Sequence, residues 1–354
     1  MKKFALGAVP ALLIASGLSH AAGLQILEQS ASGIATSYAG SAAVAENASV
    51  GFYNPAGLTQ LKGMQISAGV VGLKANIENS TGGGNAGESM LAPNLYLSMQ
   101  LTPDWYFGLG VSRPYGVSTE YAAPGVSGVL KTEISTVNYN PSVAYRVSDR
   151  VSLGLGLNYQ RLNAELTGVG ALNSDDSAYG WNAGALFTLS QAMKVGVAYR
   201  SGVNHTLAGG EGLKLPGTLT LSVWQQLSER WEAMGDLSYS RWNRFNQSST
   251  DFLGGGVYDN AWRVSWGAAY KSSDALKLKF GFAYDRAATR NGNLSLRAPE
   301  TDRFWLSAGV QWNAGAMGRV DLGYAYKYSR DAESAVGRYD TSGHVLGLQY
   351  STGF

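Results

Sequence analysis

Long segments of this chain alternate apolar residues with small or polar ones, and this pattern limits the fold more than any other feature. Residues 151–159, VSLGLGLNY, place Val, Leu or Tyr at every odd position and Ser, Gly or Asn at every even one. The same period of two recurs in residues 262–270, 276–284 and 320–328. Alternation over this length predicts β-strands with one apolar face. The 46 glycines in 354 residues, nearly twice the usual share of about 7%, favour the same all-β fold.

The predicted strands are too long for a soluble sandwich, whose strands run about 5 or 6 residues. Their connections alternate between short ones, such as TPD and SDR, and long ones, such as NSTGGGNAGE. An even number of strands with this alternation is typical of outer-membrane barrels, with lipid outside and a polar lumen inside. Residues 63–354 therefore predict a transmembrane antiparallel β-barrel. About fourteen strands are expected, near residues 63–78, 89–101, 105–122, 131–147, 151–167, 178–189, 193–205, 213–227, 231–244, 258–270, 275–289, 300–312, 318–331 and 341–354.

The end of the chain and its aromatic residues point to the same membrane. The last predicted strand ends in an aromatic carboxyl terminus, Phe354. Such an end is similar to the signal that the barrel assembly machinery recognises. Tyrosine and tryptophan gather near strand ends, as aromatic girdles at a bilayer interface require. We expect a monomer that contacts lipid and lipopolysaccharide in the outer membrane of a Gram-negative bacterium. The net charge of +2 predicts no nucleic-acid partner.

The N-terminus has the pattern of a secretory signal. Two lysines precede an apolar run at residues 4–18, and SHA at residues 19–21 follows as a cleavage signal. A signal peptide over residues 1–21 is predicted, with Ala22 as the first mature residue. A membrane anchor is the alternative, but the run is shorter than the roughly 20 residues that a spanning helix needs.

Residues 22–62 carry no strand pattern and few charges, so they are a poor match for a solvated tail. We expect them to form an N-terminal hatch domain inside the lumen, where irregular backbone does not touch lipid. A turn at Asn54, Pro55, Ala56 and Gly57 lies in this segment. The side chain of Asn54 can bond its own backbone there, which leaves Phe52 free to pack. An ordinary turn leading into the first strand is the alternative.

This segment and parts of the barrel resemble a known family. GLQILEQSASGIATSYAGSAAVAENASVGFYNPAGLT, residues 23–59, is similar to the hatch of the outer-membrane long-chain fatty acid and hydrocarbon transporters of the FadL/TodX type. FGLGVSRPYGVSTEY at 107–121 and APETDRFWLSAGVQW at 298–312 are similar to that family's barrel blocks. The resemblance implies a fourteen-stranded barrel plugged by a hatch. It also implies passive, diffusion-driven uptake of hydrophobic small molecules, with no cofactor.

The third predicted strand carries Pro114 and Gly116, which interrupt a ladder and permit a bend. In the same register Arg113 faces lipid, at about 2–4 kcal/mol if it lies at the midplane. A kink at Arg113, Pro114 and Gly116 is therefore predicted. An arginine at the edge of the membrane that reaches water is the alternative. The resemblance implies lateral release of ligand at such a kink.

The resemblance also implies ligand contacts. Arg161 matches a basic lumen residue that holds a carboxylate, and the family inserts its hatch N-terminus, here Ala22, Gly23 and Leu24, into the pocket. Phe52 is expected as an apolar contact beside them. A second basic residue is expected just before residue 261, but this chain has Asp259 and Asn260 there. The substrate is therefore left open between a long-chain fatty acid and an uncharged aromatic or aliphatic hydrocarbon.

Two rival functions are weaker. A non-specific porin needs an open lumen, whereas about forty residues here are predicted to fill it. An enzyme is disfavoured because His205 and His344 lie near predicted strand ends and belong to no Ser-His-Asp motif. The chain has no cysteine, so a thiolate metal site is excluded, and no metal is expected.

Overall fold

The computed structural model describes residues 24–79, 85, 87–122, 129–168, 171–247, 258–289, 301–329, 332–334 and 337–354. The predicted signal peptide, Ala22 and Gly23 lie outside these residues. No helix within the described ranges is both long and apolar enough to cross a membrane.

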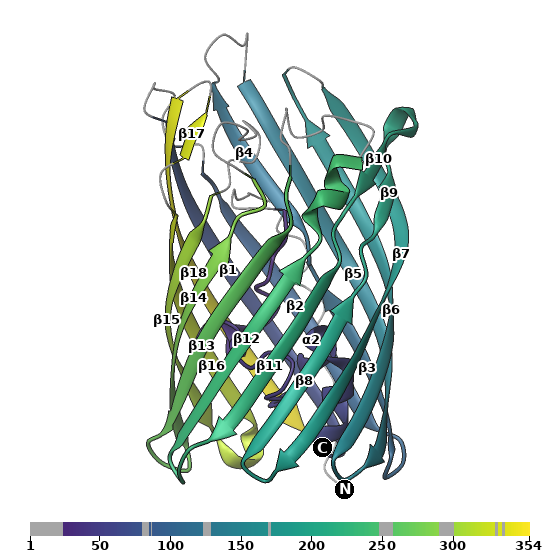
Figure 1. Cartoon of the computed structure of the whole chain (residues 1–354), viewed down its shortest axis with the longest axis vertical. Coiled ribbons are helices and arrows are strands. Elements are labelled where there is room, and N and C mark those ends of the chain that lie inside the picture. Colours follow the sequence, from purple (N-terminus) through teal and green to yellow (C-terminus); the bar gives the residue numbers. More distant parts are fainter. Residues whose placement is uncertain are drawn as a thin grey trace, which may run out of the picture.

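The strands form a closed antiparallel barrel (Figure 1). Within the described ranges sixteen strands join one sheet, and β1 (Met64–Asn79) pairs with β18 (Gly337–Gly353), which closes it. β4 (Gly116–Ala122) continues β3 (Trp105–Ser112) along the edge of β5, and β17 (Ala332–Ser334) only extends β18, so the wall has 16 − 2 = 14 strands. The predicted fold class is confirmed. The remaining wall strands are β2 (Ser89–Gln100), β5 (Val129–Ser148), β6 (Val151–Leu166), β7 (Leu172–Ser190), β8 (Met193–Arg200), β11 (Thr218–Gln226), β12 (Trp231–Ser240), β13 (Ala261–Lys271), β14 (Leu276–Arg286), β15 (Arg303–Asn313) and β16 (Arg319–Ser329).

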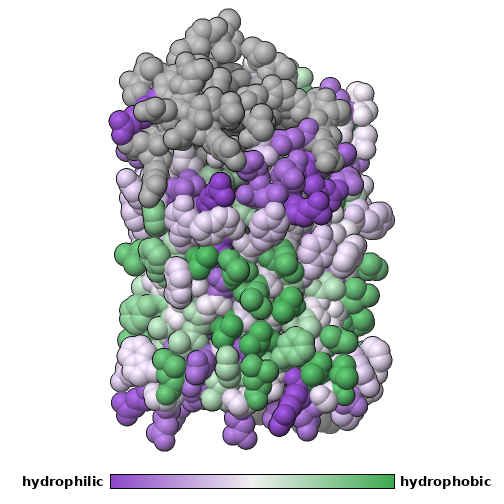
Figure 2. Space-filling model, in the orientation of Figure 1, coloured by the Kyte–Doolittle hydropathy of each residue, from purple (hydrophilic) through white to green (hydrophobic). Residues whose placement is uncertain are grey.

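The outer face of the wall is apolar because alternate side chains point away from the lumen. On β6, Leu153, Leu155 and Leu157 are 49% to 63% exposed. Figure 2 shows an apolar band of this kind on the face in view. Aromatic pairs border this band. Trp105–Tyr145 and Trp231–Tyr270 lie at the end with short turns, the short-turn end, and Tyr139, Tyr159 and Tyr179 form an aromatic row toward the opposite, long-loop end.

Beyond the aromatic row the outer face of β6 becomes polar and its lumen face becomes apolar. Arg161 points outward and is exposed, whereas Leu162, Ala164 and Leu166 are buried on the lumen side. The register against β5 and β7 does not shift among these residues. β6 is therefore polar outside and apolar inside at this end, as expected where the barrel leaves the bilayer.

Residues 24–62, the hatch segment, lie inside the barrel (Figure 1). They form α1 (Ala31–Ile34), α2 (Val50–Tyr53) and the 3-10 helix η1 (Pro55–Gln60). Asn54 is fully buried; its Oδ1 accepts from Ala56 N at 3.0 Å, and its Nδ2 donates to Ala42 O at 2.7 Å and to Ala185 O of β7 at 3.1 Å. Pro55 begins η1, where its missing N–H leaves no helical bond unmade.

A ring of inward-facing glycines lets the hatch segment touch the wall. On each of nine strands, a Cβ added at one glycine would lie less than 3.0 Å from a hatch atom. At Gly184 it would lie 2.0 Å from Asn54 Oδ1, and at Gly281 it would lie 2.1 Å from the carbonyl carbon of Thr36. The high glycine content therefore serves close packing against the hatch segment. This glycine ring consists of Gly108, Gly154, Gly184, Gly196, Gly267, Gly281, Gly309, Gly323 and Gly347.

Two strands are shorter than predicted, and the residues freed by this fold into the lumen at the long-loop end. The strand expected at 193–205 ends with β8, and the one expected at 213–227 begins with β11. Between them β9 (Asn204–Thr206) and β10 (Gly212–Lys214) form a separate small sheet, joined through η2 (Ala208–Gly210). Leu207, Leu213 and Leu215 are buried there, which explains why the chain leaves the wall. His205 is buried as well, between Gln160 and Asp176.

Candidate transport pathway

The third strand of the wall is interrupted at Arg113 and Pro114, between β3 and β4. The register against β5 shifts by one residue across this interruption. An extra residue on one strand makes a bulge, and Pro114 has no N–H with which to continue the ladder. The interruption therefore lies at the residues that the sequence singled out.

β2 loses its neighbour at this point. It pairs with β3 only as far as Leu95, opposite Val111, and no described ladder joins residues 89–94 to β4. We call this opening, between residues 89–94 and 113–118, the wall break. Val111 also lies opposite Tyr139 of the aromatic row, so the wall break is near the bilayer interface. The energy of an arginine at the membrane midplane therefore does not apply to Arg113.

The first residues of the hatch segment cover the wall break from inside. Gly116 N donates to Leu24 O and Ile26 N donates to Pro114 O, each at 2.8 Å. Residues 24–26 thus occupy the strand edge that β2 leaves free. Gln29 adds two bonds, because its Nε2 donates to Arg113 O at 2.7 Å and its Oε1 accepts from Arg113 N at 2.9 Å. Four hydrogen bonds therefore hold the hatch segment against the wall break.

A cavity of about 130 Å³ lies on the lumen side of this contact. Its lining includes the apolar groups of Phe52, Pro114 and Tyr115 as well as polar side chains from β11 and β12. A smaller cavity of about 40 Å³ reaches Met90 of β2 and Gly116 of β4. Gln25 and Ile26 line both cavities, so they separate the larger cavity from the wall break.

Arg200 lines the larger cavity without a carboxylate partner among the described residues. Its Nη2 donates to Phe52 O at 2.8 Å, its Nη1 donates to Asn158, and its guanidinium carbon lies 4.1 Å from the centre of the Phe52 ring. Two other arginines of the cavity differ: Arg263 forms an ion pair with Asp285, and Arg303 lies 3.7 Å from the same carboxylate. Arg286 also lines the cavity, but it is exposed. Arg200 therefore leaves a positive charge uncompensated beside apolar groups.

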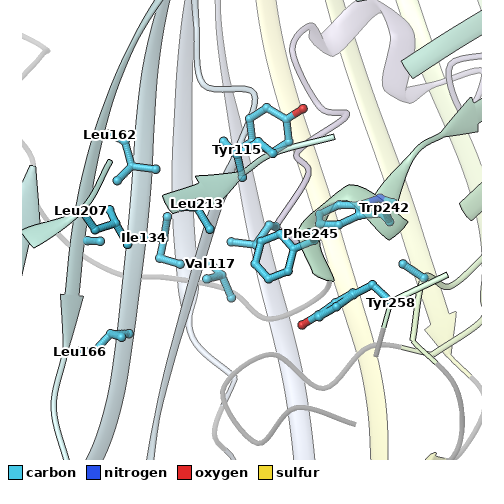
Figure 3. Packing of buried hydrophobic residues seen from close by; sticks show 14 residues of the cluster. Tyr115, Val117, Ile134, Leu162, Leu166, Leu207, Leu213, Trp242, Phe245 and Tyr258 are labelled. Atoms are coloured by element: carbon cyan, nitrogen blue, oxygen red, sulfur yellow. The ribbon is translucent and has the colours of Figure 1, made fainter. Parts of the chain in front are cut away.

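An apolar cluster lies between the cavity and the long-loop end (Figure 3). Trp242, Phe245 and Tyr258 form its aromatic part, with ring centres 4.8 to 6.2 Å apart. Trp242 and Phe245 belong to η3 (Trp242–Gln247). Tyr115 belongs to this cluster and also lines the cavity, so the two are continuous. Leu24 is buried in the same cluster.

Ion pairs hold the hatch segment on the opposite side of the barrel from the wall break. Glu46 lies 2.6 Å from Lys279 Nζ and 3.2 Å from Lys277 Nζ, and Arg319 donates to its carbonyl oxygen at 3.0 Å. Burial alone would raise the pKa of Glu46, but Lys279, Lys277 and Arg319 together hold it well below its usual range. A second anchor is Asp236 of β12, which accepts from Gly40 N at 2.6 Å.

The predicted site residues fall in different places. Phe52 and Pro114 line the larger cavity, Gly116 the smaller one, and Ala22 and Gly23 lie outside the described residues. The hatch turn, Asn54, Pro55, Ala56 and Gly57, is buried against β6 and β7 and lines neither cavity. Arg161 does not meet the expectation that it holds a ligand in the lumen. It is exposed on the outer face and lines neither cavity, because odd positions of β6 point outward.

Sequence analysis missed the special position of Arg200. A usable signal exists, because its cross-strand neighbours Asn182 and Thr218 are uncharged. Arg263, by contrast, lies opposite Asp285. Gln29 carries no such signal, since its partners are backbone atoms of the wall.

A barrel with an apolar outer band, a filled lumen and a break in the strand pairing of its wall is the architecture of a membrane-spanning transport protein. Over residues 12–214 and 211–354 the chain matches the family described as outer membrane protein transport protein (OMPP1/FadL/TodX), and it belongs to that family. It is 31% identical to outer membrane protein P1 of Haemophilus influenzae, over 92% of this chain and 90% of that protein. It is 27% identical to the long-chain fatty acid transport protein of Escherichia coli K12, over 97% of this chain and 96% of that protein.

Solved structures agree with the fold. A Pseudomonas aeruginosa FadL homologue has a TM-score of 0.83 at 19% identity, covering 94% of this chain and 100% of its own. The Pseudomonas putida toluene transporter TodX has a TM-score of 0.73 at 17% identity, covering 92% of this chain and 98% of its own. The chain is thus a member of a family of transport channels in the outer membrane of Gram-negative bacteria. In such barrels short turns face the periplasm and long loops face outside.

Proposed function

We propose that this protein takes up long-chain fatty acids by diffusion and releases them sideways into the outer membrane through the wall break. The observation that carries the proposal is the position of residues 24–26, between the cavity and the wall break. Moving a methylene from an apolar site into water costs about 0.8 kcal/mol, so a sixteen-carbon chain released into the periplasm would face roughly 12 kcal/mol. Lateral release avoids most of this cost.

The hatch segment works as the gate on this route. The ligand enters through the apolar cluster at the long-loop end and reaches the cavity beside Tyr115. The four hydrogen bonds that hold residues 24–29 at the wall break contribute about 1 kcal/mol each, or about 4 kcal/mol together. Burying about five methylenes supplies the same free energy. A long apolar chain therefore gains enough on binding to displace this contact.

Arg200 supports a fatty acid over an uncharged ligand. A carboxylate in the cavity would meet Arg200, which lines it and has no acidic partner among the described residues. Charge-assisted hydrogen bonds of this kind contribute about 1.5–3 kcal/mol.

The size of the larger cavity favours a second candidate, a monoaromatic hydrocarbon that takes the same route. An apolar cavity near 150 Å³ holds benzene, and the larger cavity here, whose lining combines apolar and polar side chains, has about 130 Å³. A sixteen-carbon chain needs the additional room that appears when residues 24–26 move and the two cavities join.

Uptake by a deletion strain that carries this gene separates the candidates. Labelled oleate and labelled toluene would be compared in wild type, Arg200→Gln and the control Arg146→Gln. Arg146 also holds a hatch carbonyl, Thr59 O, and packs on a ring, that of Tyr106, but it lies outside the cavity. We expect oleate uptake to fall about tenfold or more in Arg200→Gln alone, with toluene unchanged. Uptake of toluene only would favour the hydrocarbon candidate, and equal passage of small sugars would indicate a porin.

A further inference from the structure

The side chain of Arg113 spans the wall break. Its backbone is held from inside by Gln29, while its Nη1 reaches across to β2 and donates to Leu91 O at 3.3 Å. Leu91 lies in the part of β2 that has no described neighbour on this side, so this carbonyl belongs to the free edge. Arg113 is therefore the one described side chain whose hydrogen bonds join the two rims of the wall break.

This guanidinium keeps unused capacity for an anion. Arg113 forms no ion pair with a described carboxylate, and its Nε is buried without a hydrogen-bond partner in the described structure. Glu133, a carboxylate on neighbouring β5, is already 3.2 Å from Lys131. The contact to Leu91 O is long for a charged donor, whose bonds to an anion are typically about 2.7–2.9 Å. An anionic group at the wall break would thus be a better hydrogen-bond acceptor for Arg113 than the carbonyl oxygen of Leu91.

The height of Arg113 fits the headgroup of an amphiphile. It follows Val111 by two residues, and Val111 lies opposite Tyr139 of the aromatic row that borders the apolar band. A fatty acid that leaves sideways ends with its chain in the hydrocarbon and its carboxylate at this level. The apolar chain needs no polar partner in the wall break, whereas an ionised carboxylate taken from water without a partner costs several kcal/mol.

We propose that Arg113 is an anion subsite at the lateral exit, which binds the carboxylate of a departing amphiphile while its chain enters the bilayer. The guanidinium exchanges its contact with Leu91 O for a paired contact with the carboxylate, and a planar fork suits both oxygens. Arg113 in this role selects for anionic amphiphiles at the exit, in addition to any selection by Arg200 in the lumen. This inference rests on the lateral release proposed above.

The test compares two ligands that differ only in the headgroup. Labelled oleate and labelled oleyl alcohol would be given to the deletion strain expressing wild type, Arg113→Gln or Arg113→Lys, with folding of each variant checked by heat-dependent gel mobility. We expect Arg113→Gln to lower oleate uptake about tenfold and oleyl alcohol uptake less than twofold. Arg113→Lys keeps the charge and should retain oleate uptake to within about threefold.

Three results would overturn the subsite. The first is an equal fall for both ligands in Arg113→Gln, which would mean that Arg113 only shapes the wall break or binds a lipopolysaccharide phosphate there. The second is no change for either ligand. The third is loss of oleate uptake in Arg113→Lys equal to that in Arg113→Gln. Failure of the proposed function is distinguishable, because it would appear as wild type that carries neither ligand.

Discussion

Replacing one glycine of the glycine ring should loosen the hatch segment and leave the wall intact. In Gly281→Ala the new Cβ would lie 2.1 Å from the carbonyl carbon of Thr36 and 2.4 Å from Ser37 N, both backbone atoms. An ordinary contact needs about 3.4 Å, so the two backbones must separate by 3.4 − 2.1 = 1.3 Å. Overpacking of this kind typically costs about 1–3 kcal/mol. The hatch segment yields first, because β14 is held by ladders on both sides.

Hydrogen exchange measured by mass spectrometry reads this change directly. If the hatch opens locally, a cost of about 1–3 kcal/mol accelerates exchange roughly 5- to 150-fold in peptides covering residues 31–45. Peptides of β14 should exchange as in wild type. Gly235→Ala is the matched control, since a Cβ there lies 3.5 Å from its nearest neighbour, Ser265 O. Unchanged exchange in residues 31–45, or equal acceleration in β14, would refute the close-packing argument.

Two further predictions concern the contacts that hold the hatch segment. Gln29→Ala removes both hydrogen bonds to the backbone of Arg113, at about 1–3 kcal/mol, and should raise the influx of a small apolar fluorescent dye several-fold. The control Gln60→Ala, at the other end of the hatch segment, should leave the influx unchanged. Equal influx in both variants would contradict the role of Gln29. The pKa of Glu46 is lowered in the folded protein, so its contribution to hatch stability is present above its unfolded pKa of about 4.3 and is lost as the pH falls through the lower folded value. The ratio of hatch exchange in Glu46→Gln to that in wild type isolates this contribution. It should stay constant and above one from about pH 8 to 5 and fall toward one only below about pH 4. A fall that begins already at pH 6 would be inconsistent with the ion pairs.

The wall could be predicted because lipid imposes a simple rule on it. Each strand has one face in hydrocarbon, so the period of two that marks VSLGLGLNY survives as exposed leucines on β6. The rule stops at the bilayer edge. Past Tyr159 the apolar side chains Leu162 and Leu166 turn to the lumen, and Arg161 faces out, although the backbone register is unchanged. Recognising that Arg161 faces outward required knowing where the membrane ends.

The site was less predictable because its geometry depends on contacts between distant segments. Pro114 and Gly116 marked the interruption, since each has a local backbone effect. Residues 24–26 cover the wall break through backbone hydrogen bonds, which the identity of their side chains does not predict. The sequence showed the glycine ring only as a high glycine content, because each glycine of the ring packs against a different hatch atom.

A reversible disulfide that holds residues 24–26 against the wall break tests the lateral route most directly. Gln25 and Tyr115 face each other as a non-hydrogen-bonded antiparallel pair, whose Cα atoms are typically about 4.5 Å apart, within the range of a disulfide. The natural chain has no cysteine, so a Gln25→Cys, Tyr115→Cys double variant can form a disulfide at this site alone. We predict that oleate uptake stops in the oxidised variant and returns on reduction. Uptake at the same rate in the oxidised and reduced forms would contradict release through the wall break.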